Sequence, residues 1–360
     1  MESVGWRFPR HFVPRNDELI RGSLVPSEKP PHQAGCLIVA VLLLTGCAGN
    51  RPALDSIVAG TDLPVTVELA DTPFFPQEVY QCGPAALATV LVASGITVTP
   101  EQLVGKVYLP QRQGSLQLEL IAASRRYQRL PYRIDPSLPA MLAELDAGRP
   151  VLVLQNLGLA SYPVWHYAVV IGFNTADNTI LLRSGDRERL VMRTGKFLHT
   201  WELASNWALI ALRPGDFPVN VDEFRYLRAV AALEEVGKTA SAIRYYSAAL
   251  KRWPGSTLAL FGLGNSYYSQ GELRQAESQY HRLLAIEPGN TAARNNLAQV
   301  LADRGCNDAA FATVDTGLAS ATPGSATRKS LLEIRQRLIN RPSVPQPGTV
   351  CPVAGEFGWQ

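Results

Sequence analysis

The stretch that decides the fold of the first large domain is Gln77-Glu78-Val79-Tyr80-Gln81-Cys82-Gly83-Pro84-Ala85-Ala86-Leu87-Ala88. Proline suits the first turn of a helix and alanine propagates it, so the run predicts a helix whose N-terminus lies at Cys82. A helix N-terminus favours a thiolate over a thiol. Gln77 stands five residues upstream, where its side-chain amide can lie beside the thiol. The alternative is a buried cysteine that acts as a small apolar side chain.

A cysteine nucleophile needs a base, and the chain has five histidines. His11 and His32 precede an expected cleavage point, and His281 lies in a later helical region. His166 opens the run His166-Tyr167-Ala168-Val169-Val170-Ile171-Gly172-Phe173, which predicts a buried strand with histidine at its mouth. His199 is interpreted as structural. The sequence therefore predicts a Cys82–His166 pair, with the nucleophile on a helix and the base on a sheet.

The composition is that of an ordinary globular protein. At 360 residues, two or more domains are expected. The chain is 46% hydrophobic and 18% charged, with a net charge of +3, so no nucleic-acid partner is indicated.

The N-terminal region carries a short apolar run, Cys36 to Leu44, that ends in Leu44-Thr45-Gly46-Cys47. The run is too short to span a bilayer but fits a secretory signal. Its end resembles a bacterial lipobox, which implies a signal region over 1–46 and lipidation at Cys47. Ala48 after that cysteine implies, by the same resemblance, an outer-membrane anchor facing the periplasm. The alternative is a core helix. Residues 47–72 are interpreted as a linker.

The remaining cysteines are Cys306 and Cys351. An export route leads to an oxidising compartment, which makes them a candidate disulfide. The alternative is two free buried thiols. They lack partners at zinc spacing, so no metal site and no cofactor are predicted.

Residues 73–215 are interpreted as one α+β unit. Helices are expected over 83–95, 100–107, 115–127 and 137–147. Strands are expected over 150–157, 166–173, 179–183, 189–193 and 207–213. Helices followed by consecutive antiparallel strands are typical of a papain-like arrangement.

Beyond residue 218 the pattern becomes helical and periodic. Gly237, Gly271 and Gly305 are each separated by 34 residues, as are Pro254 and Pro288. This period is that of a tetratricopeptide repeat. Residues 220–340 are therefore predicted to form an all-α repeat solenoid, with a capping helix over 326–340 and a C-terminal tail over 341–360.

The residues quoted above carry a resemblance. Gln77, the Gln-Cys-Gly-Pro-Ala-Ala run at 81–86 and the run at 166–172 resemble the bacteriocin-processing, double-glycine cysteine peptidases of the papain clan. The whole chain resembles bacterial lipoproteins that join such a domain to tetratricopeptide repeats. The resemblance implies that Cys82 is the nucleophile, His166 the general base and later acid, and Gln77 the oxyanion-hole donor.

One position departs from that family. An Asp-Pro pair usually ends the strand after the histidine strand, and its aspartate orients the histidine. Here the chain has Ser184-Gly185-Asp186, so the orienting residue is either Asp186 or Ser184.

The sequence thus predicts a lipid-anchored cysteine peptidase of the cell envelope that acts on a peptide or protein substrate and recruits a protein partner through its repeats. Two alternatives remain. The first domain is a degenerate peptidase that binds peptides or acts as a scaffold, or the repeats serve envelope assembly and the first domain is only a fold.

Overall fold

The computed structural model describes residues 54–76, 81–340, 344 and 350–352. The expected signal region 1–46, the expected lipidation site Cys47, and Gln77 lie outside these residues. Among the described residues, no helix is both long enough and apolar enough to cross a membrane.

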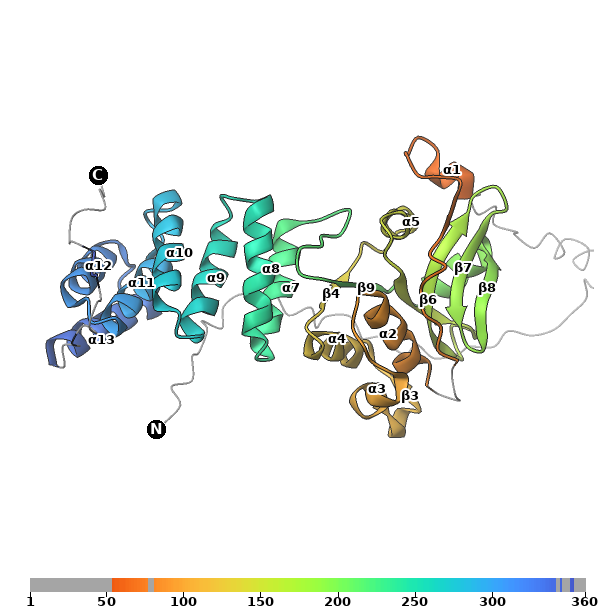
Figure 1. Ribbon diagram of the computed structural model, residues 1–360, viewed down its shortest axis with the longest axis horizontal. Helices are drawn as coiled ribbons and strands as arrows, with labels where there is room; N and C mark the ends of the chain where they lie inside the picture. Colours follow the sequence, from red (N-terminus) through yellow and green to blue (C-terminus); the bar gives the residue numbers. More distant parts are fainter. Residues whose placement is uncertain (1–53, 77–80, 341–343, 345–349, 353–360) are drawn as a thin grey trace, which may run out of the picture. The chain divides into compact units, whose positions relative to one another are not determined.

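The first domain is an antiparallel sheet covered on both faces (Figure 1). Its strands run in the order β4-β9-β5-β6-β7-β8, and β1 pairs with β6 beside β5. Their bounds are β1 Thr66–Glu68, β4 Leu130–Arg133, β5 Val151–Asn156, β6 Trp165–Asn174, β7 Thr179–Ser184, β8 Arg187–Arg193 and β9 Ala208–Leu212. Two short strands, β2 Tyr108–Leu109 and β3 Gly114–Ser115, form a separate ribbon.

Helices α2 Cys82–Ala93, α3 Pro100–Val107 and α4 Gln117–Arg126 contribute to the core on one face of the sheet. Helices α1 Leu54–Val58, α5 Leu138–Asp146 and α6 Thr194–Glu202 contribute to the core on the other face. Alternate residues of β6 divide between them: Tyr167, Val169 and Ile171 belong to the α2 core, and Ala168 and Val170 to the opposite one. This period-two division is what a doubly covered strand requires.

The predicted α+β fold is confirmed, and the helix and strand positions agree within a few residues. Strand β4 and helix α6 were not expected from the sequence. The interpretation of 47–72 as a linker is wrong in its described part, because β1 lies there and pairs with Gly172, Phe173 and Asn174 of β6. Gly172 permits this approach, since a Cβ on it would lie 2.2 Å from the Val67 carbonyl oxygen.

The second domain consists of helical pairs in series (Figure 1). Their bounds are α7 Glu223–Glu235, α8 Thr239–Arg252, α9 Thr257–Ser269, α10 Leu273–Ile286, α11 Thr291–Asp303, α12 Asn307–Ser320 and α13 Ala326–Asn340. The predicted all-α repeats and the terminal helix are confirmed.

The 34-residue period has two structural causes. Gly237, Gly271 and Gly305 adopt φ values of 71°, 77° and 79°, which turn the chain between the two helices of a repeat. Asp222, Ser256 and Asn290 are also 34 residues apart, and each accepts a hydrogen bond from the backbone N–H three residues later. These residues are the N-caps that start the first helix of each repeat.

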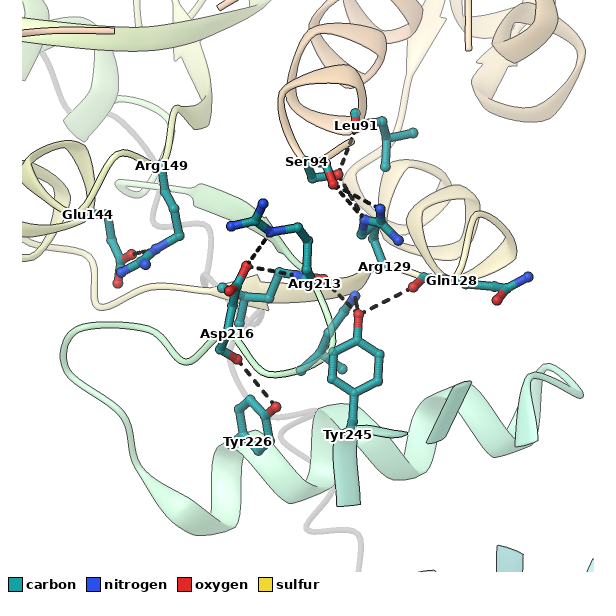
Figure 2. A network of polar contacts seen from close by, with 12 residues as sticks. Leu91, Ser94, Gln128, Arg129, Glu144, Arg149, Arg213, Asp216, Tyr226 and Tyr245 are labelled. Carbon is teal, nitrogen blue, oxygen red and sulfur yellow. Dashed lines mark hydrogen bonds and ion pairs between the residues drawn. The ribbon is translucent and has the colours of Figure 1, made fainter. Parts of the chain in front are cut away.

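A buried contact joins the two domains (Figure 2). Tyr245 of α8 is fully buried; its hydroxyl donates to the Leu212 carbonyl at 2.7 Å and accepts from the Leu130 N–H at 3.0 Å. Tyr245 therefore satisfies backbone groups of both β9 and β4. The first repeat thus packs on the sheet as part of one continuous hydrophobic core.

Cys306 and Cys351 form a disulfide that ties the tail to the turn before α12. The carbonyl of Val350 also accepts a hydrogen bond from Arg304 at 2.8 Å.

Candidate active site

Cys82 is the first residue of α2, whose residues Gly83 to Leu91 are all buried. The helix is apolar around its circumference, which is expected of a central helix. Gly83 permits close packing at its first turn, because a Cβ there would lie 2.3 Å from Ser115 Oγ and 2.5 Å from Ser115 Cβ. The glycine in the Cys-Gly-Pro run therefore lets β3 cover the start of the helix beside the thiol.

The thiol of Cys82 interacts with the backbone N–H of Tyr167 on β6. The sheet explains why this N–H is available. Leu154 of β5 is opposite Tyr167, and its N–H donates to the Trp207 carbonyl on the far side of β5. Residues opposite each other in such a pair direct their backbone groups away from one another, so the Tyr167 N–H points away from β5, towards the β7 side. The register of β6 with β7 ends at Val169 and Arg183. The Tyr167 N–H therefore donates to the Cys82 sulfur rather than to a neighbouring strand.

His166 lies directly before Tyr167, so Cys82 and His166 meet at one peptide unit of β6. Because successive side chains of a strand point to opposite faces, the His166 imidazole lies on the face of Ala168 and Val170, opposite to Tyr167. In the described residues no hydrogen bond joins Cys82 Sγ to the His166 ring, and Nδ1 has no partner there. The thiol of Cys82 therefore contacts the peptide unit that joins His166 to Tyr167 rather than the His166 ring itself.

The Nε2 atom of His166 lies 2.8 Å from Ser184 Oγ. Ser184 ends β7 and is buried, whereas Asp186 is exposed in the β7–β8 turn. Within the part of the chain that the structure describes, Asp186 makes no hydrogen bond or ion pair. Of the two residues expected to orient the histidine, Ser184 is therefore the one that contacts the His166 ring.

Burial shifts the pKa of both Cys82 and His166. Burial raises the pKa of the Cys82 thiol, and the N–H groups of Tyr167, Gly83 and Cys82 offset this only partly. Burial also lowers the pKa of His166. The expectation that the helix N-terminus favours the thiolate is thus corrected: desolvation exceeds the effect of the N–H groups at the helix start, so the net shift of the Cys82 pKa is upward.

Arg183 fixes the segment that leads to the candidate site. Its buried guanidinium donates to the carbonyl oxygens of Ala70 and Thr72, and also to that of Glu188 at 2.5 Å. Residues 70–72 are therefore tied to the strand that carries Ser184. No motif in the sequence indicated this role or the packing of Ser115 on Gly83, because both contacts join residues far apart in the chain.

His199 lies in α6, away from any described polar contact with Cys82 or His166. No group of three His, Cys, Asp or Glu side chains that could hold a metal ion occurs among the described residues.

Comparison with known proteins agrees with this architecture. Residues 69–208 match the Peptidase_C39 like family, and residues 227–273 and 261–326 match the tetratricopeptide repeat. The chain therefore carries a C39-peptidase-like domain followed by tetratricopeptide repeats.

Two solved structures resemble parts of the chain. A putative C39-like peptidase from Bacillus anthracis aligns with 17% identity and a TM-score of 0.36, over 41% of this chain and 98% of that one. The Sgt2 tetratricopeptide repeat domain from Aspergillus fumigatus aligns with 17% identity and a TM-score of 0.31, over 40% of this chain and 97% of that one.

Among curated proteins, a tetratricopeptide repeat and J domain-containing co-chaperone, DNJ1, from Fusarium oxysporum f. sp. lycopersici is 34% identical over 125 residues. The match covers 35% of this chain and 24% of that protein, so it spans about a quarter of the relative's length.

Proposed function

We propose that the first domain is a cysteine peptidase in which Cys82 attacks a peptide carbonyl and His166 transfers the protons. The observation that carries this proposal is the position of the Cys82 thiol at the Tyr167 N–H, one peptide unit from His166. Acyl transfer to sulfur requires a base within hydrogen-bond reach of the thiol, and His166 is the base that the proposal assigns to Cys82.

In the proposed reaction, the Cys82 proton passes to His166 Nδ1 as the sulfur bonds to the carbonyl carbon. The resulting oxyanion is received by N–H groups at the start of α2, with the Gln77 amide as a further expected donor. Protonated His166 then gives its proton to the leaving nitrogen, and the C–N bond breaks. Water, deprotonated by His166, releases the acyl group from sulfur. Ser184 holds Nε2 throughout.

Among the described residues, a hydroxyl and no carboxylate meets His166 Nε2, which favours a second candidate, a peptide-binding module without turnover. A serine hydroxyl orients an imidazole but carries no charge to stabilise the imidazolium. The raised pKa of Cys82 and the lowered pKa of His166 also favour the binding module, because both shifts disfavour a thiolate–imidazolium pair.

Alkylation of Cys82 separates the two candidates. The protein without residues 1–46 is treated with iodoacetamide across a pH series, and labelling at Cys82 is followed by peptide mass spectrometry. A rate that His166→Ala lowers several-fold near neutral pH supports an assembled pair. A rate that follows the thiol's own titration and ignores His166→Ala leaves the binding module as the function.

We also propose that Cys47 carries a lipid that anchors the protein in the bacterial cell envelope, with its domains facing the periplasm and its repeats recruiting a protein partner. The Leu-Thr-Gly-Cys sequence supports the anchor, and the Cys306–Cys351 disulfide is in keeping with an oxidising compartment. Metabolic labelling with an alkyne fatty acid tests it: the protein should incorporate label, and Cys47→Ser should not.

A further inference from the structure

The connection between β5 and β6 presents a group of exposed apolar side chains directly beside the candidate site. Leu157, Leu159, Tyr162, Val164 and Trp165 are all exposed, with Leu159 at 67%, Tyr162 at 78% and Trp165 at 53%. They are five of the seventeen large apolar side chains that are exposed in the described part of the chain, yet they fall within nine residues. We call residues 157–165 the apolar hairpin.

The apolar hairpin has a defined backbone. The Leu157 N–H donates to the Val164 carbonyl at 2.8 Å, and the Leu159 N–H donates to the Tyr162 carbonyl at 3.1 Å. The buried Asn156 side chain holds it from within: its Oδ1 accepts from the N–H groups of Gly158 and Val164, and its Nδ2 donates to the Leu159 carbonyl. Presenting apolar groups on an ordered backbone lowers the entropy lost when a ligand binds.

The segment that contains the apolar hairpin has no acidic or basic side chains apart from His166. Between Arg149 and Asp177 the chain contains no Asp, Glu, Lys or Arg. A surface of this composition gains little from a charged ligand and gains most from covering apolar side chains of the ligand.

The apolar hairpin leads directly into the residues of the candidate site. Trp165 directly precedes His166, and Tyr167, whose N–H meets the Cys82 thiol, is two residues from Trp165. At about 3.3 Å per residue, the hairpin reaches from the thiol over a length of about four extended substrate residues. The hairpin is therefore within reach of a peptide whose carbonyl lies at Cys82.

We infer that the apolar hairpin is the specificity-determining element of the site and selects substrates with uncharged, apolar side chains within about four residues of the scissile bond. This inference rests on the proposed function at Cys82 and His166, because it assigns the hairpin's ligand to that site.

The test uses binding and turnover separately. Two dye-labelled decapeptides, one with Leu and Phe at its central positions and one with Ser and Gln there, are titrated into Cys82→Ala protein and followed by fluorescence anisotropy. The apolar peptide should bind at least about tenfold more tightly, as the burial of a few methylene groups provides. Leu159→Ser and Tyr162→Ser should each remove most of that preference.

A matched control is Leu258→Ser in α9, which changes a side chain that is 52% exposed but remote in sequence and fold. This variant should bind both peptides like the parent. Because all three substituted side chains are exposed, the variants should fold, and circular dichroism confirms this before titration.

Each outcome decides the inference. Equal affinity for the two peptides, or an unchanged preference in both hairpin variants, overturns it. Hairpin variants that lose binding to phosphatidylcholine vesicles while keeping the peptide preference also overturn it, and assign the hairpin to a membrane surface.

Turnover of internally quenched versions of the same peptides by the unsubstituted protein tests the proposed function independently. Apolar preference in binding with no cleavage of either peptide supports the inference and contradicts the peptidase. Cleavage of both peptides at equal kcat/KM supports the peptidase and contradicts the inference.

Discussion

The imidazole of His166 is held by a hydroxyl: its Nε2 lies 2.8 Å from Ser184 Oγ. This pairing fixes the orientation of the ring without adding a charge next to it. A carboxylate at the same position would favour the imidazolium, and a methyl group would leave the ring without a partner. The residue at 184 is therefore expected to control both the pKa of His166 and the reactivity of Cys82.

Ser184→Asp is expected to activate the pair. A carboxylate next to Nε2 should raise the pKa of His166 by roughly 1–3 units, because it stabilises the protonated ring. The imidazolium should in turn lower the pKa of the Cys82 thiol, and iodoacetamide labelling near neutral pH should become several-fold faster. Ser184→Ala is the matched control and should not accelerate labelling. Equal rates in both variants would show that Ser184 does not act through His166.

The stability of the fold should depend on His166 under acidic conditions. The pKa of His166 is lowered in the folded state, so the unfolded chain binds more protons than the folded chain below the ordinary histidine value of about 6.5. This contribution is fully present above about pH 6.5 and is lost as the pH falls towards the folded-state value. Urea unfolding at pH 7.5 and 5.5 measures the loss.

The control for this measurement is His166→Gln, which cannot titrate and should lose less stability between the two pH values than the parent. His281, whose pKa burial also lowers, should contribute independently, so His281→Gln is measured beside it. A parent and a His166→Gln variant with the same pH dependence would contradict the role of burial at His166.

Gly83→Ala should disrupt the start of α2. The new methyl group would lie 2.3 Å from Ser115 Oγ, so the helix start or β3 must move. Overpacking of this kind costs about 1–3 kcal/mol. The expected result is a lower free energy of unfolding together with altered labelling of Cys82.

The double variant Gly83→Ala/Ser115→Gly provides the internal check. The next atom is Tyr167 Cδ2 at 3.7 Å, an ordinary contact, so removing the Ser115 side chain should restore much of the lost stability. A double variant as unstable as the sum of the two single variants would mean that the contact between these residues is not the cause.

Tyr245→Phe should weaken the packing of the repeats on the sheet. Without the hydroxyl, the buried Leu130 N–H and Leu212 carbonyl lose their partner, which costs about 1–3 kcal/mol. Tyr162→Phe removes a hydroxyl from an exposed ring and should change the free energy of unfolding little. Thermal unfolding of both variants gives the comparison, and equal midpoints would show that the Tyr245 hydroxyl does not stabilise the domain contact.

Local sequence determined the elements of this protein. The Cys-Gly-Pro-Ala-Ala run specifies a helix with Cys82 at its N-terminus, because proline fits its first turn and alanine extends it. The apolar run after His166 specifies a buried strand, and the 34-residue period specifies repeated helical pairs. Strand β4, with the sequence Leu-Pro-Tyr-Arg, was missed because its pairing with β9 rather than its own composition makes it a strand.

Tertiary structure alone decided the chemistry of the candidate site. Which of Ser184 and Asp186 meets His166 depends on where β7 ends and its turn begins, a matter of register that spacing does not encode. The directions of the Cys82 and His166 pKa shifts also depend on the tertiary structure. A motif reveals the helix N-terminus that favours a thiolate, but only the folded chain reveals the burial that opposes it, because desolvation depends on neighbours distant in sequence.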